Sequence, residues 1–342
     1  MHGRKKQFSP LTENEINAIN EKSKLYTSLL EILIDKRKKQ EYSEDNLLFT
    51  TNMIVKNPDF FTLWNYRREI LISLHGIETN LSLNIPNEKI KNDIIRDQEL
   101  LISTEGIKKN PKSYGAWYHR QWIAERFDID ITKELELCKL FLKEDQRNFH
   151  CWNYRRFIVT LGNIKPDLEY EFSNEKIKEN FSNYSAFHHR SVYIVLIIKN
   201  NNYNLDIMKD LVNEEIDIIT NAIFTEPDDQ SSWWYLLFLF KFINNFIYNS
   251  NDNSTNTECE TAKVWFHDIL TNMITTIKEL LHEESECTWA LKSLINIIDI
   301  YKTNNHKIEN IKQLLNDRNE YILLLMKIDP VHKNRYNYLL QQ

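Results

Sequence analysis

The sequence predicts an all-α protein, a right-handed α–α superhelix (solenoid) of helical hairpin repeats. Two observations carry this prediction: a shortage of turn-forming residues and an internal repeat. The chain has 342 residues but only 5 Gly and 7 Pro, where average composition gives roughly 24 and 17. Because glycine supplies the positive φ of tight strand turns, so few glycines cannot connect many β-strands.

The repeat has five members, each built on an aromatic anchor residue. Their sequences are PDFFTLWNYRRE at 58–69, PKSYGAWYHRQW at 111–122, QRNFHCWNYRRF at 146–157, FSNYSAFHHRSV at 181–192 and PDDQSSWWYLLF at 227–238. The anchors are Trp64, Trp117, Trp152, Phe187 and Trp233. The two middle intervals are both 35 residues, the length of one helix–turn–helix unit. The outer intervals of 53 and 46 predict inserted loops around 76–94 and 196–206.

Apolar residues at fixed offsets predict the first helix of each unit. They stand 17, 15 and 10 positions before every anchor, as Leu47, Phe49 and Ile54 do before Trp64. Seven residues make two helical turns, so the outer two rows lie on one face. A single hairpin cannot bury that face alone, and we expect neighbouring units to stack. The units are predicted near 45–76, 95–128, 133–161, 168–196 and 212–243, in a single domain spanning 1–342.

A turn and a capping residue predict the start of each second helix. Pro58, Pro111 and Pro227 stand six residues before their anchors. Side chains four residues before the anchors can accept hydrogen bonds from the first free N–H groups of a helix; these are Ser113, Asn148, Asn183 and Asp229. In the first unit Asp59 is expected to take this role. An aromatic residue three positions before the anchor is expected to share its face, as Phe61, Tyr114, Phe149 and Tyr184.

The flanking regions are also predicted to be helical. Residues 10–46 should form a leading helix or a pair of helices. Within 260–342 we expect an amphipathic helix at 265–282, a sixth hairpin begun near Trp289 and a terminal helix after Pro330.

Composition excludes several functional classes. The formal charge of −6 gives no general attraction to nucleic acid or to an anionic membrane. The glycines are too scattered for a nucleotide-binding G-x-G-x-x-G or P-loop motif, and the four cysteines form no C-x-x-C pair. No secretory signal or transmembrane segment is apparent. The sequence thus predicts a cytoplasmic protein with reduced thiols.

Three positions after the anchors stands a row of arginines, Arg67, Arg120, Arg155 and Arg190, with Leu236 in the fifth unit. Such a row can face an acidic partner, or each guanidinium can bridge to a carboxylate or carbonyl of the adjacent repeat. We favour the structural role. For His119, His188 and His189 metal binding is not expected, because no second ligand lies four residues away. No catalytic motif is present, so the residues alone indicate a helical repeat protein that binds a partner.

The W-x-x-R units resemble the protein prenyltransferase α-subunit repeat, which in that family forms a crescent around a catalytic β subunit. Within the family, MHGRKK at the N-terminus, NPDFFTLWNYRRE at 57–69 and the segments 136–157 and 180–191 look like the Rab-type enzyme's α subunit. KIDPVHKNRYNYLL at 327–340 resembles the closing segment of the family's helical domain. Two alternatives stay open: the α subunit shared by farnesyltransferase and type I geranylgeranyltransferase, which usually has a Pro-rich extension, and a non-enzymatic TPR-like scaffold. Immunoglobulin-like and leucine-rich repeat modules of animal relatives are not expected here.

The resemblance implies a heterodimer that transfers geranylgeranyl from geranylgeranyl diphosphate to C-terminal cysteines of Rab GTPases. Zinc and most catalytic groups would lie on the β subunit, and a Rab escort protein would dock on the α subunit. For this chain it implies that Lys112 and Tyr114 lie on the diphosphate side, with Arg147 as a second basic candidate. It also implies that His2 can reach the zinc of the β subunit as a ligand in trans.

Overall fold

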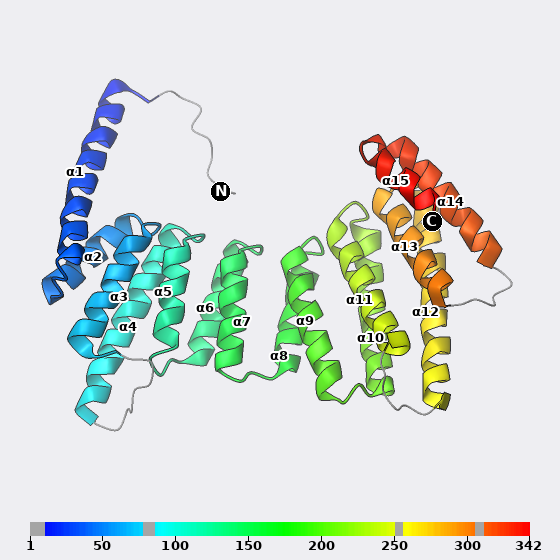
Figure 1. Cartoon of the computed structure of the whole chain (residues 1–342), viewed down its shortest axis with the longest axis horizontal. Helices are drawn as coiled ribbons and strands as arrows, with labels where there is room; N and C mark the ends of the chain where they lie inside the picture. Colours follow the sequence, from blue (N-terminus) through cyan, green and yellow to red (C-terminus); the bar gives the residue numbers. More distant parts are fainter. Residues whose placement is uncertain (1–10, 78–85, 250–255, 305–310) are drawn as a thin grey trace. The chain divides into compact units, whose positions relative to one another are not determined.

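The computed structural model describes residues 11–77, 86–249, 256–304 and 311–342 (Figure 1). These residues form α-helices and one 3₁₀ turn, and the described part of the chain contains no β-strand. The all-α prediction is therefore confirmed. The chain divides into two compact units, residues 1–162 and 163–342, while the single domain over 1–342 stays a prediction. His2 lies outside the described residues.

Unit 1 (residues 1–162) is a leading helix followed by three helical hairpins. The leading helix is α1 (Glu13–Lys38), which Thr12 caps by accepting from the Glu15 N–H. The hairpins are α2 (Glu44–Lys56) with α3 (Phe61–His75), α4 (Pro86–Lys109) with α5 (Tyr114–Ala124), and α6 (Ile131–Glu144) with α7 (Phe149–Leu161). The second helices pack side by side, α3 on α5 and α5 on α7 (Figure 1).

Unit 2 (residues 163–342) continues the same arrangement. Its hairpins are α8 (Pro166–Glu179) with α9 (Tyr184–Asn200), α10 (Leu205–Thr225) with α11 (Gln230–Asn249), and α12 (Asn256–Glu283) with α13 (Thr288–Asn304). The last of these is the predicted sixth hairpin. The chain then forms α14 (Ile311–Ile328), the turn η1 (Pro330–His332) and α15 (Lys333–Leu340), which confirms the terminal helix after Pro330. Helix α11 packs between α9 and α13.

The four tryptophan anchors bind the turns of their hairpins. The indole N–H of Trp64 donates to the Pro58 carbonyl at 2.8 Å, and Trp117 does the same to Pro111 at 2.8 Å. Trp152 and Trp233 repeat the contact with the carbonyls of Gln146 and Pro227. All five anchors are buried. The accepting carbonyl lies in the turn between two helices, outside the hydrogen bonds of either helix, and the buried indole N–H gives it a partner.

The predicted caps are confirmed at four of the five hairpins. Ser113 accepts from the Ala116 N–H, and Asn148, Asn183 and Asp229 accept equivalent bonds. Two of these side chains also reach the preceding turn, because Ser113 donates to the Pro58 carbonyl and Asn148 to the Pro111 carbonyl. The cap residue thus joins one repeat to the next.

Three details of the sequence prediction are wrong. Asp59 does not cap α3; it accepts from the Asn110 side chain of the following turn. The insertion around 196–206 is not mainly a loop, because it lengthens α9 and α10 and leaves a short turn at 201–204. Of the loop predicted around 76–94, residues 86–94 are in the same way helical, within α4, and residues 78–85 lie outside the described part of the chain.

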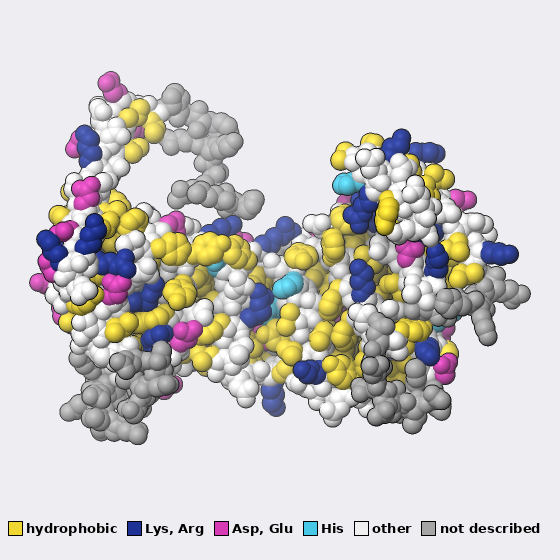
Figure 2. Space-filling model, viewed as in Figure 1, with side chains coloured by type: hydrophobic (Ala, Val, Ile, Leu, Met, Phe, Trp, Pro, Cys, Tyr) yellow, Lys and Arg dark blue, Asp and Glu magenta, His cyan; other side chains and the backbone are white. Residues whose placement is uncertain are grey.

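The third error concerns the aromatic residues three positions before the anchors. Phe61, Tyr114, Phe149 and Tyr184 do not share the buried face, because 47–58% of each is exposed. Three positions on a helix differ by about 300°, and here the first turn points its aromatic toward solvent. Figure 2 shows hydrophobic side chains gathered along the upper ends of the unit 1 hairpins.

Candidate functional site

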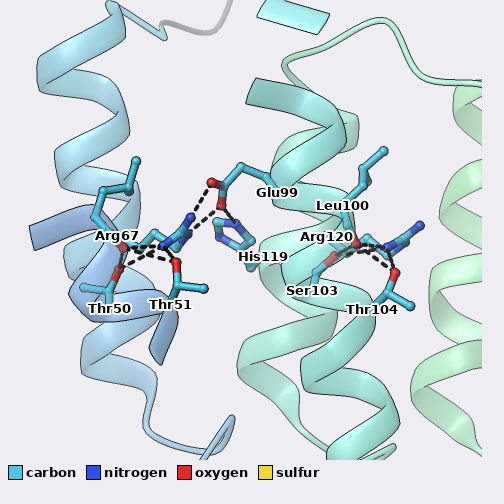
Figure 3. A network of polar contacts seen from close by, with 10 residues as sticks. Thr50, Thr51, Arg67, Glu99, Leu100, Ser103, Thr104, His119 and Arg120 are labelled. Atoms are coloured by element: carbon cyan, nitrogen blue, oxygen red, sulfur yellow. Dashed lines mark hydrogen bonds and ion pairs between the residues drawn. The ribbon is translucent and has the colours of Figure 1, made fainter. Parts of the chain in front are cut away.

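A buried layer of charge joins successive repeats. In unit 1 the Arg67 guanidinium donates to both oxygens of Glu99, each at 2.6 Å, and Arg120 donates to both oxygens of Glu134 at 2.7 Å. In unit 2 Arg190 contacts Glu215 at 2.8 Å. Each arginine projects from the second helix of one hairpin, and each glutamate from the first helix of the next. Figure 3 shows this relationship for Arg67 and Glu99.

The remaining guanidinium nitrogen of each arginine is bound within its own hairpin. The Arg67 Nη1 atom donates to the Leu47 carbonyl and to the hydroxyls of Thr50 and Thr51, at 2.7–2.9 Å. Arg120 makes the same three contacts to Leu100, Ser103 and Thr104 (Figure 3). Arg155 and Arg190 reach the carbonyl twenty residues earlier, that of Leu135 and that of Tyr170. For Arg67, Arg120 and Arg190 these contacts agree with the structural interpretation of the arginine row.

A tyrosine or histidine two positions after the anchor completes each site. The His119 Nε2 atom lies 2.9 Å from Glu99, and the Tyr154 hydroxyl donates to Glu134 at 2.7 Å. In unit 2 His189 and Tyr235 contact Glu169 and Glu215 at 2.8 Å. Each glutamate thus meets an aromatic donor of its own repeat. These two histidines have structural roles.

Burial and charge shift the titration of the Glu99 site. Burial would raise the pKa of Glu99, but the Arg67 charge and the hydrogen bonds from His119 and Arg67 lower it to about 2. Burial lowers the pKa of His119 to about 4, against the opposing pull of Glu99. The imidazole is therefore neutral at pH 7 and donates its Nε2 proton, while its buried Nδ1 atom has no hydrogen-bond partner.

Sequence reasoning found the arginines but missed their partners. The glutamates stand 18 positions before the anchors, as Glu99, Glu134, Glu169 and Glu215. The hydroxyl row stands 14 positions before, as Thr50, Ser103 and Ser173. Both rows could have been predicted from the sequence, because a glutamate and a small polar residue recur at these fixed distances before the anchors. The first unit has Asn46 at the glutamate position, and no earlier repeat supplies an arginine to it.

Lys112 and Tyr114 lie on the exposed side of the same repeats. Lys112 belongs to the turn before α5, and its Nζ atom lies 3.6 Å from Asp145, in the turn before α7. The Tyr114 ring is 58% exposed and stands edge-on to His150, with the ring centroids 4.2 Å apart. Phe61 and Phe149 flank it at 6.4 and 6.0 Å. We call Phe61, Lys112, Tyr114, Phe149 and His150 the turn surface.

The turn surface combines one cation with aromatic rings. The Lys112 side chain is 38% exposed and its partner Asp145 is 37% exposed, so water screens the pair. Burial and the Lys112 charge lower the pKa of His150, which makes Lys112 the main positive group beside the rings. Arg147, the second basic candidate, is exposed in the next turn, where its main-chain N–H donates to Asp145. This arrangement can present positive charge to an anion.

Neither a metal site nor a membrane span is found within the described ranges. No group of three or more His, Cys, Asp or Glu side chains there is placed to hold a metal ion. None of the described helices is long and apolar enough to cross a membrane.

The hairpins match a known family of repeats. Five segments match the protein prenyltransferase alpha subunit repeat, at residues 43–74, 96–127, 131–161, 166–195 and 212–243. The second and third matched segments contain both the W-x-x-R anchor and the buried glutamate. The hairpins of this chain are therefore prenyltransferase α-subunit repeats, a class with the α–α superhelix fold.

Sequence relatives narrow the class. A geranylgeranyl transferase type-2 subunit alpha of Dictyostelium discoideum is 34% identical over 93% of this chain and 92% of its own length. The protein of the same description from Saccharomyces cerevisiae is 32% identical over 100% of this chain and 99% of its own length. The chain belongs to the geranylgeranyl transferase type-2 alpha subunit family. It covers 41% of the length of the human relative, to which it is 39% identical over 240 residues.

A solved structure agrees on the fold. The protein geranylgeranyltransferase-I of Candida albicans, complexed with GGPP, has a chain that superposes with a TM-score of 0.64 at 21% identity. The match covers 100% of this chain and 95% of the other. The descriptions of the sequence relatives favour the type-2 family over the farnesyltransferase and type I alternative and over a TPR-like scaffold.

Proposed function

We propose that this chain is the α subunit of a heterodimeric Rab geranylgeranyltransferase. In this proposal it binds a β subunit that carries the zinc and most of the active site. The complex transfers geranylgeranyl from geranylgeranyl diphosphate to C-terminal cysteines of Rab GTPases in the cytoplasm. The observation that carries the proposal is the match along nearly the full length of two type-2 alpha subunits. The buried arginine–glutamate layer supports a scaffolding role, because its ion pairs join one hairpin to the next.

The turn surface is the part of this chain that we assign to the reaction. Transfer of the prenyl group leaves negative charge on the diphosphate oxygens, and a positioned ammonium group stabilises that charge. Lys112 is suited to this task because it is half-exposed and its ion pair with Asp145 is long, at 3.6 Å. Tyr114 adds a hydroxyl beside it on an exposed ring. Zinc, held by the β subunit, would keep the acceptor cysteine as a thiolate.

Two further assignments rest on the family resemblance. His2 is proposed to reach the zinc of the β subunit, since neutral imidazole is a good zinc ligand. The outer helices are proposed to dock a Rab escort protein. Neither depends on the geometry of the turn surface.

Co-expression with a type-2 β subunit tests the proposal. We expect a stable 1:1 complex that survives gel filtration, and no complex with the β subunit of a farnesyltransferase. A soluble monomer that ignores both β subunits would instead support a free-standing scaffold.

A further inference from the structure

A cleft of about 330 Å³ lies within unit 2, between α11, α13, α14 and α15. Its floor is apolar, formed by the indoles of Trp234 and Trp289 with Leu237, Leu325 and Leu339. Trp234 is 52% exposed, and its ring centroid lies 6.4 Å from that of Trp289. The volume is near the lower end of ligand pockets, which suits one or two large side chains.

The charged residues that line the cleft are all basic. They are Lys241 on α11, Lys292 on α13 and Arg335 on α15. Asp329, which does not line the cleft, holds Lys292 at 3.1 Å, and within the described chain Lys241 and Arg335 have no ion-pair partner. Hydrophobic and basic side chains lie together over α15 in Figure 2. In a protein of net charge −6, an apolar cleft with a basic rim fits an acidic ligand.

A buried hydroxyl adds an independent observation. Ser293 lines the cleft and is 1% exposed, yet its hydroxyl has no hydrogen-bond partner. A buried polar group without a partner costs free energy. A ligand that brings a hydrogen-bonding group into the cleft removes this cost. The hydroxyl therefore marks the cleft as a site completed by binding.

We propose that this cleft binds an acidic peptide segment of a partner protein, which inserts an aromatic or branched aliphatic side chain between Trp234 and Trp289. Carboxylates of the segment meet Lys241 and Arg335, which lie on different helices, and a peptide carbonyl or amide meets Ser293. A lipid fits less well, because it has one charged end and its hydrocarbon chain offers nothing to the buried hydroxyl. Tryptophan, tyrosine and arginine are also the residues enriched at energetic centres of protein interfaces.

A phage-displayed library of random dodecapeptides, selected on the full chain, is the probe. We expect enriched clones to carry Asp or Glu beside an aromatic or leucine, and to bind with a Kd of about 1–100 μM as free peptides. Lys241→Glu, Arg335→Glu and Trp234→Ala should each weaken binding about tenfold or more. Ser293→Ala should weaken it less and leave the melting temperature unchanged or raised, because the variant removes the unsatisfied group.

Matched controls separate the cleft from surface charge and exposed aromatics in general. Lys312→Glu alters an exposed lysine of α14, and Tyr338→Ala removes an aromatic of α15 that is 61% exposed; neither residue lines the cleft. Both should bind the selected peptides as the parent does. Clones that bind cleft and control variants equally, or a library that yields no acidic clones, would overturn the proposal. Two further results together would also overturn it. They are saturable binding of dodecanoate that displaces every selected peptide, and equal binding of peptides in which lysine replaces each acidic residue of the selected clones.

Discussion

Arg67 and Glu99 lie 32 positions apart and join two hairpins through two hydrogen bonds of 2.6 Å, with only 3% and 1% of their side chains exposed. The guanidinium is also bound to three oxygen acceptors of its own hairpin. All three guanidinium nitrogens thus have hydrogen-bond acceptors, which is the condition under which a buried ion pair is tolerated.

Arg67→Ala should lower the free energy of unfolding by about 3–5 kcal/mol, because it leaves the Glu99 carboxylate buried without its cation. Urea denaturation followed by circular dichroism measures this loss. Arg37→Ala is the control: Arg37 pairs with Glu69 at the same 2.6 Å distance, but 32% and 34% of the two side chains are exposed. That change should cost about 1 kcal/mol or less. Equal losses at the two sites would refute the special role of the buried layer.

The protein should lose stability as the pH falls below about 6.5. The pKa of His119 is lowered to about 4 in the folded state, so the unfolded chain binds more protons between pH 6.5 and pH 4. The stability that His119 contributes is thus complete above pH 6.5 and is lost as pH falls through about 4. The lowered pKa of Glu99 acts in the same direction, from about pH 4.5 downward.

Urea denaturation midpoints measured at pH 7, 6, 5 and 4 test this predicted loss of stability with falling pH. His119→Gln keeps a donor for Glu99 but cannot be protonated, and it should flatten the curve between pH 6.5 and pH 5. A variant with the parent's pH profile would show that other groups control acid unfolding.

Gly115→Ala should destabilise the chain by more than about 1 kcal/mol, because an added Cβ atom would lie 2.4 Å from the Trp64 ring. Glycine at this helical position thus leaves room for the indole of Trp64, the anchor of the preceding repeat. Ser185→Ala changes the equivalent position of the fourth repeat and should stay within about 0.5 kcal/mol. Trp64→Leu should reduce the additional cost of Gly115→Ala in a double-mutant cycle; full additivity would argue against the clash.

Lys112→Ala should lower kcat for geranylgeranyl transfer by more than a few-fold in the reconstituted heterodimer, because an ammonium near the leaving diphosphate is lost. Single-turnover rates at saturating geranylgeranyl diphosphate isolate this step. Lys108→Ala removes a neighbouring lysine whose side chain is 60% exposed and should leave the rate unchanged. Unaltered rates for Lys112→Ala would remove this residue from the mechanism.

Deletion of residues 1–6 tests the role proposed for His2. If the imidazole reaches the zinc of the β subunit, the truncated enzyme should show a changed basal rate of transfer, and His2→Ala should reproduce the change. Identical kinetics for the full-length and truncated enzymes would leave the N-terminus without this role.

The hairpins were predictable because their determinants are local. Trp117, Ser113 and the apolar residues before them lie within one short segment, and each repeat shows the pattern again. The spacing predicts that Arg120 belongs to a repeated row of arginines, but it does not identify the partner. Glu134 belongs to the next hairpin, and only packing brings the two side chains together. Tyr114 was predicted to share the buried face of Trp117 but is exposed. A three-residue spacing at the start of a helix does not determine the direction in which a ring points.

The cleft of unit 2 was not predictable from sequence for the same reason. Trp234 adjoins a repeat anchor, and Arg335 lies a hundred positions later in a segment that matches no repeat. Their convergence depends on how α14 packs on α13 and α15 on α14, which brings α15 to the cleft that α11 and α13 also line. The sequence periodicity predicts the repeats, but it does not predict how the helices after the last repeat pack.

The most direct test of the central claim is the rate of geranylgeranyl transfer to a Rab GTPase with C-terminal cysteines, measured with radiolabelled geranylgeranyl diphosphate and this chain co-purified with a type-2 β subunit. The proposed function predicts transfer that requires both chains, and no transfer when the β subunit of a farnesyltransferase replaces the type-2 subunit. Equal transfer by the β subunit alone, or a co-purified complex that transfers no lipid to Rab, would contradict it.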